Sequence, residues 1–117
     1  VLLCPRERVS TPWAYAAWDR NNPLTEERNG AITRASQSLF GGTSSIRWLE
    51  NSFEPSVFEA FPRLRRFRER LLREGAFAAV MSGSGSSLFG LFRDADVALR
   101  AAEGFREEDV AVYGHAL

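Results

Sequence analysis

The sequence predicts an α+β fold: a four-stranded antiparallel sheet with helices mainly on one face, as in ferredoxin-like split β-α-β domains. Residues 77–92 place two apolar runs on either side of a Ser/Gly turn, which is typical of a β-hairpin. A further strand pattern begins the chain, another ends it, and helical patterns fill the connections. With 117 residues, 44% of them hydrophobic, the chain suits one domain, 1–117, with a moderate core.

The first elements follow from an apolar run and a helix start. Residues 1–9 predict a strand, with Pro5 as a candidate interruption because proline cannot donate to a ladder. Thr11 is the expected N-cap of a helix and Pro12 its first residue. This helix should end near residues 19–23, and its tryptophans are expected to pack rather than to bind a ligand. Its shared face is predicted to hold Trp13, Ala16 and Ala17.

Residues 21–44 are the least regular stretch. Asn and Gly residues punctuate them, and short helices are predicted at 32–39 and 45–49. Loops of this length are uncommon in compact domains and are often functional, but the sequence assigns this one no role.

A strong helical pattern follows. Glu54 and Pro55 open it, Pro62 predicts a break, and the main helix is expected at 63–74, with Gly75 as the C′ stop. Six arginines lie between positions 63 and 73, and the balanced charge of the chain favours a solvated face over a nucleic-acid surface.

The last part of the chain returns to helix and strand. Asp94 is the expected cap of a helix that ends at Gly104, and 109–115 predicts the final strand. The hairpin runs 77–81 and 88–92 are apolar at almost every position, so both faces of the sheet require cover. Residues 21–50, another domain or a second copy in a homodimer would supply it.

Composition excludes several classes of site. The 15 basic residues, all arginine, balance 15 acidic ones, which gives no reason to expect a nucleic-acid or membrane partner. Lysine is absent, which removes a lysine phosphate clamp. Cys4 and His115 are single residues of their kinds and cannot form a Cys/His metal site or an internal disulfide. No transmembrane run or signal peptide pattern is present, so the cytoplasm is the expected location.

The hairpin turn is the candidate site. It alternates small hydroxyl residues with glycines: Ser82, Gly83, Ser84, Gly85 and Ser86. Glycine permits positive φ and close approach, and successive free N–H groups can bind an anion. The turn is neither a Walker A loop nor a dinucleotide fingerprint. From local chemistry it is either a plain hairpin connector or a phosphate-binding turn.

Taken together, several segments resemble the C-terminal domain of the GHMP small-molecule kinases. They are Val9-Ser10-Thr11 with the Trp13–Asp19 run, Asn51-Ser52-Phe53-Glu54, Phe61-Pro62, and the stretch Met81–Gly90. The Ser-Gly-Ser-Gly turn is shared by many members of this superfamily, whereas the first two segments are typical of fewer members. Ser52 departs from the family pattern, where Asp is expected.

The resemblance implies the function of a longer protein. It implies transfer of the γ-phosphate of ATP, with magnesium, to the 2-hydroxyl of 4-diphosphocytidyl-2-C-methyl-D-erythritol in non-mevalonate isoprenoid biosynthesis. It places residues 82–86 close to the nucleotide phosphates. The ATP loop and the catalytic residues belong to an N-terminal domain, so this chain holds no catalytic or metal-binding residue and is expected to be inactive alone.

Two alternatives remain open from the sequence. One is another GHMP kinase, acting on a mevalonate derivative, homoserine or a sugar. The other is a non-catalytic ferredoxin-like binding or dimerisation module. The chain begins without Met inside an apolar run, which predicts the C-terminal part of a longer protein with its own N-terminal kinase domain as partner.

Overall fold

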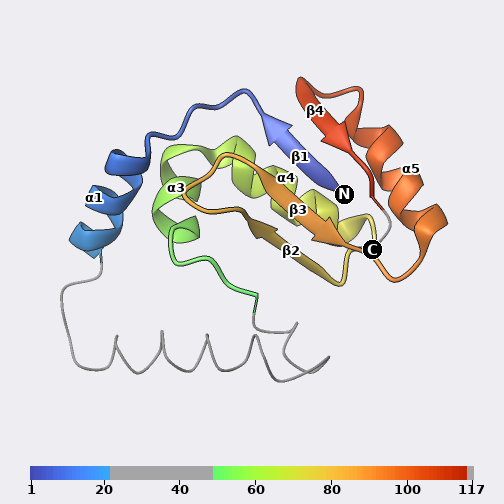
Figure 1. Ribbon diagram of the computed structural model, residues 1–117, viewed down its shortest axis with the longest axis horizontal. Coiled ribbons are helices and arrows are strands. Elements are labelled where there is room, and N and C mark those ends of the chain that lie inside the picture. Colours follow the sequence, from blue (N-terminus) through green and yellow to red (C-terminus); the bar gives the residue numbers. More distant parts are fainter. Residues whose placement is uncertain (22–48, 116–117) are drawn as a thin grey trace.

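The computed structural model describes residues 1–21 and 49–115 (Figure 1). In chain order its elements are β1 (Leu2–Pro5), α1 (Thr11–Asn21), α3 (Glu54–Ala60), α4 (Pro62–Arg73), β2 (Ala78–Met81), β3 (Leu88–Leu91), α5 (Ala95–Phe105) and β4 (Val110–Tyr113). The helices predicted at 32–39 and 45–49 lie outside the described residues, apart from Leu49, which is not helical. Among the described residues, no helix has the length and apolar character needed to cross a bilayer.

The four strands form one antiparallel sheet in the order β2-β3-β1-β4. This is the ferredoxin-like order, so the predicted fold is confirmed. The central pairing sets Leu3 opposite Leu88, and Met81 in turn lies opposite Leu88 from the other side. These side chains therefore point to one face, where they are almost fully buried.

Helix α4 covers that face under β2 and β3, and α5 lies beside it under β4 (Figure 1). The rings of Phe67 and Phe105 join the two helices edge to face, with centroids 5.9 Å apart. Trp13 of α1 packs edge to face on Phe61, 5.7 Å between centroids, as the packing prediction expected. The buried face of α1 holds Ala14 and Ala17; Ala16, predicted to share it, is exposed.

The opposite face of the sheet is covered unevenly. Near the end of β2, Val80 is only 4% exposed, although it points away from α4. Across the sheet, Leu2 is 37% exposed and Tyr113 59% exposed. The predicted cover by residues 21–50 falls largely outside the described residues.

Local signals place the middle helices correctly. Pro62 begins α4 directly after α3, which confirms the predicted break. At the end of α4 the Ala76 N–H donates to Leu71 O (3.0 Å) and the Gly75 N–H to Leu72 O (3.1 Å), the Schellman pattern. Gly75 has φ +106°, so it is the predicted C′ residue.

Two capping predictions need correction. The first turn of α1 is closed by the Ala14 N–H donating to Ser10 O (2.9 Å), so Ser10, not Thr11, is the N-cap. Helix α5 begins as predicted, because Asp94 Oδ1 accepts from the Val97 N–H at 3.0 Å. It continues through Gly104 to Phe105.

The arginine row of α4 is only partly a solvated face. Arg63 donates to Glu7 Oε1 and to Asp109 O, each at 3.0 Å. Arg70 donates to Glu108 Oε1 and to Gly104 O at 3.0 Å and lies over the Phe105 ring. A Cβ at Gly104 would lie 3.0 Å from Arg70 Nη2, so this glycine leaves room for the guanidinium. The exposed arginines are Arg65, Arg66 and Arg73.

Candidate functional site

The Ser/Gly turn joins β2 to β3 and is closed at its base by one main-chain bond. The Ser82 N–H donates to Ser87 O at 2.8 Å, and inside the turn the Gly85 N–H donates to Ser82 O at 3.1 Å. Gly83 has φ +56° and Gly85 φ +98°, conformations that favour glycine. Both glycines therefore use the conformational freedom for which the sequence analysis singled them out.

Several donors of this turn stay free of the main chain. Among the described residues, the N–H groups of Gly83, Ser84 and Ser86 donate to no backbone carbonyl. Because they lie in an exposed or half-exposed turn, water or a ligand oxygen can accept from them. Neighbouring N–H groups in such a turn can form a concavity that binds anions.

The two glycines have different surroundings. A Cβ at Gly83 would meet no atom within 4 Å, so only its backbone conformation calls for glycine. A Cβ at Gly85 would lie 3.0 Å from Met81 Sδ and 3.3 Å from Val9 Cγ2. Gly85 is therefore also a point of close packing between the turn and the segment before α1.

The segment between β1 and α1 holds one side of the turn. The hydroxyls of Thr11 and Ser84 share a hydrogen bond at 3.0 Å. The Ser86 hydroxyl donates to Pro5 O at 3.3 Å. Thr11 thus binds the turn, although the sequence suggested it as a helix cap.

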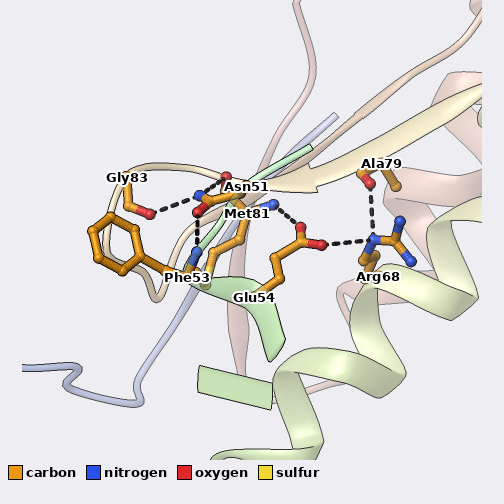
Figure 2. A network of polar contacts seen from close by, with 7 residues as sticks. All are labelled: Asn51, Phe53, Glu54, Arg68, Ala79, Met81 and Gly83. Atoms are coloured by element: carbon orange, nitrogen blue, oxygen red, sulfur yellow. Dashed lines mark hydrogen bonds and ion pairs between the residues drawn. The ribbon is translucent and has the colours of Figure 1, made fainter. Parts of the chain in front are cut away.

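A second segment, residues 51–54, holds the other side (Figure 2). The Asn51 side-chain amide donates to Met81 O and to Gly83 O, both at 2.7 Å, while its Oδ1 accepts from the Phe53 N–H at 2.9 Å. The turn predicted as a site and the Asn-x-Phe-Glu segment are therefore in direct contact. The family resemblance marked Asn51, but no local signal connected it to a carbonyl 32 residues away.

Glu54 and Arg68 extend this network along the free edge of β2 (Figure 2). Glu54 Oε1 accepts from the Met81 N–H at 2.7 Å, and the Arg68 Nε–H donates to Ala79 O at 3.1 Å. The two side chains also form an ion pair at 3.4 Å. Unpaired edge groups of β2 are thus satisfied by side chains, which also blocks pairing with another strand.

Burial dominates the electrostatics of Glu54. It raises the pKa of this carboxyl above its usual value, whereas the Met81 N–H and the Arg68 charge act in the opposite direction. Glu54 already has two partners, the Met81 N–H and Arg68, and its role is therefore to satisfy the edge of β2. Ser52, the departure from the family pattern, is exposed and hydrogen-bonds to no described side chain or backbone group.

The residues fit a phosphate better than a metal ion. Free N–H groups and hydroxyls of the turn suit phosphate oxygens. Within residues 1–21 and 49–115, no group of three or more His, Cys, Asp or Glu side chains could hold a metal. The chain has no lysine. Arg68, the arginine of this network, hydrogen-bonds to Ala79 of β2 and not to the turn.

Comparison with known proteins gives one consistent result. The family described as GHMP kinases C terminal matches residues 28–111. A 4-diphosphocytidyl-2-C-methyl-D-erythritol kinase of Nitratidesulfovibrio vulgaris (strain DP4) is 44% identical over 117 residues, which are 100% of this chain and 41% of the relative. The enzyme of the same name from Oleidesulfovibrio alaskensis is 37% identical over 156 residues, with 100% of this chain and 48% of the relative covered.

A solved structure agrees with these sequences. The crystal structure of a 4-(cytidine 5'-diphospho)-2C-methyl-D-erythritol kinase superposes with a TM-score of 0.63 at 34% identity, covering 91% of this chain and 38% of that one. The chain spans between 41% and 48% of the length of the two curated relatives. With the matching fold and the family match over most of its length, the chain belongs to the GHMP kinases C-terminal domain family.

Proposed function

We propose that the full-length protein is an ATP-dependent kinase that phosphorylates the 2-hydroxyl of 4-diphosphocytidyl-2-C-methyl-D-erythritol. The observation that supports this most directly is that two segments far apart in the sequence contact one turn, whose N–H groups at Gly83, Ser84 and Ser86 have no main-chain partner among the described residues. The names of the relatives, at up to 44% identity across the whole chain, support the choice of acceptor.

In this proposal the turn Ser82–Ser86 lies close to the transferred phosphate. Phosphoryl transfer depends mainly on positioning and on stabilising charge on the phosphate oxygens. The N–H groups of Gly83, Ser84 and Ser86 would supply such stabilisation, and they need no reorganisation because the turn is held from both sides.

The rest of the chemistry belongs to the part of the protein that precedes this chain. ATP, when bound, supplies the phosphoryl group. Magnesium is expected with it, and in this proposal its protein ligands belong to the N-terminal domain. We infer that residues 1–117 alone are inactive and complete the site without supplying its catalytic residues. Use of ATP supports a cytoplasmic location.

The test is an acceptor panel with the full-length protein. Magnesium-ATP is offered with 4-diphosphocytidyl-2-C-methyl-D-erythritol and, separately, with mevalonate phosphate, homoserine and galactose, and phosphorylated products are identified by mass spectrometry. We expect product only from the first acceptor. Product from another acceptor would reassign the substrate within the family, and no product from any would favour a binding or dimerisation module.

A further inference from the structure

We propose that Asn51 is a positioning residue of the phosphate-binding turn: its side chain holds the Ser84 N–H in place to bind a phosphate oxygen. This inference rests on the proposed phosphoryl transfer. Asn51 would touch neither substrate, and it acts only through the backbone of the turn.

Both donor hydrogens of the Asn51 amide are committed to the chain. One goes to Met81 O at the end of β2, and the other goes to Gly83 O within the turn, each at 2.7 Å (Figure 2). The acceptor oxygen is also bonded, to the Phe53 N–H at 2.9 Å, which fixes the orientation of the amide. The side chain therefore has one arrangement, with its NH₂ facing two carbonyls.

The bonds from Asn51 to Met81 O and Gly83 O fix the orientation of the two peptide groups that contain these carbonyls. A trans peptide is planar with its C=O and N–H on opposite sides, so fixing a carbonyl also fixes the next N–H. Holding Met81 O directs the Ser82 N–H to Ser87 O, the 2.8 Å bond that closes the hairpin. Holding Gly83 O directs the Ser84 N–H away from Asn51, and this donor has no main-chain partner among the described residues.

Capping the edge of β2 does not require the hydrogen bond from Asn51 to Gly83 O. Covering the free edge of β2 requires partners for Met81, which Asn51 and Glu54 supply. Gly83 lies beyond the strand in an exposed turn, where water could satisfy its carbonyl. A direct bond there restricts a residue that has φ +56° and no packing neighbour for a Cβ within 4 Å. Restricting Gly83 therefore orients the backbone groups on either side of it.

The chemistry requires asparagine at this position. Aspartate has nearly the same shape but would place carboxylate oxygens against two carbonyls, so both donors would be lost and repulsion added. Alanine removes the donors without the repulsion. Asn51→Asp and Asn51→Ala in the full-length protein therefore release the turn in two ways, and the first depends on pH, because a protonated aspartate regains one donor.

Asn21 gives a matched control. Its Nδ2 donates to Ser56 Oγ at 2.8 Å between α1 and α3, a single hydrogen bond that does not involve the turn. Asn21→Asp makes the same chemical change there. Steady-state kcat and KM for both substrates, unfolding midpoints, and amide chemical shifts of Gly83 and Ser84 are measured for wild type and all three variants.

We expect kcat of Asn51→Asp to fall by about a hundredfold, the effect of a small displacement of a positioned group. KM for the phosphate acceptor should stay near the wild-type value, the Ser84 N–H shift should move, and activity should recover partly as pH falls. Asn51→Ala should lose activity without that recovery. Asn21→Asp should keep wild-type kcat and wild-type shifts in the turn.

Two results overturn the inference: an unchanged Ser84 shift in both Asn51 variants, or a near-normal kcat when that shift has moved. Failure of the proposed function is separate. If the wild-type protein phosphorylates no acceptor, the proposed function is wrong, and the shifts alone then decide whether Asn51 orients the Ser84 N–H.

Discussion

At the start of β2 the chain turns through Gly75, and at its end it turns through Gly83 and Gly85, all three with positive φ. The first turn is closed by neighbours, since its N–H groups donate to Leu71 O and Leu72 O in the preceding helix. The second is held by side chains far away in the sequence, Thr11 on one side and Asn51 on the other.

The two turns differ in how their backbone N–H groups are used, and this difference is the basis for proposing that the second turn is a site. At the end of α4 the Gly75 and Ala76 N–H groups donate to carbonyls of the last helical turn, so this end needs only the correct residue at C′. The Ser/Gly turn instead leaves N–H groups without main-chain partners in the part of the chain that the structure describes, while distant segments fix its shape. Holding unused donors in a defined geometry has a conformational cost, and under the proposed function the binding of an anion would offset that cost.

The largest expected effect comes from Gly85→Val in the full-length protein. The new Cβ would lie 3.0 Å from Met81 Sδ and 3.3 Å from Val9 Cγ2, at φ +98°. The turn must shift, and we expect kcat to fall by about a hundredfold or more, because small displacements of positioned groups are costly to catalysis. Measuring kcat and the unfolding midpoint on one preparation separates this from simple instability.

Gly83→Val provides the companion variant. No atom lies within 4 Å of its Cβ, so this change adds backbone strain without a clash. Its kcat should also fall, with less loss of stability than in Gly85→Val. Near-normal kcat in both variants would make the turn a connector and remove the contrast with Gly75.

The next effect concerns the other end of β2. Gly75→Val places a β-branched residue at φ +106° with its Cβ 2.9 Å from Val97 Cγ1. We expect the free energy of unfolding in urea to fall by about 1–3 kcal/mol through backbone strain. The folded fraction should keep its kcat, since the turn proposed to bind phosphate lies at the far end of the strand. A loss of kcat as large as that of Gly85→Val would contradict the comparison.

Local chemistry explains why the turn through Gly75 could be predicted in full from the sequence. Proline at 62 ends one helix and starts the next, Gly75 stops α4, and Asp94 caps α5, all through bonds spanning only a few residues. The hairpin and the four-stranded antiparallel split β-α-β sheet followed from the apolar runs and from the order of strands and helices along the chain. Such features are encoded within a short window of sequence.

The residues whose side chains hydrogen-bond to the Ser/Gly turn could not be predicted in this way. Asn51 and Gly83 are 32 residues apart and meet through the tertiary fold, so neither of the two carbonyl partners of Asn51 can be recognised from the residues around it. Gly104 shows the same limit from the other direction: it looked like a helix stop, but it makes room for Arg70, which comes from another helix. Tertiary contact decides the role in both cases.

The smallest expected effect tests the edge of β2 through pH. Burial raises the pKa of Glu54, so the folded protein holds this proton more tightly than the unfolded chain does. Between the ordinary Glu pKa and the raised value, ionisation therefore costs stability, and wild-type stability should fall as pH rises relative to Glu54→Gln, which does not titrate. The Met81 N–H and Arg68 oppose burial, which keeps the change small. Urea unfolding of both proteins across this window measures it. A difference that instead grows in favour of wild type would mean that these two partners outweigh burial, and that charge on Glu54 stabilises the edge beside the turn.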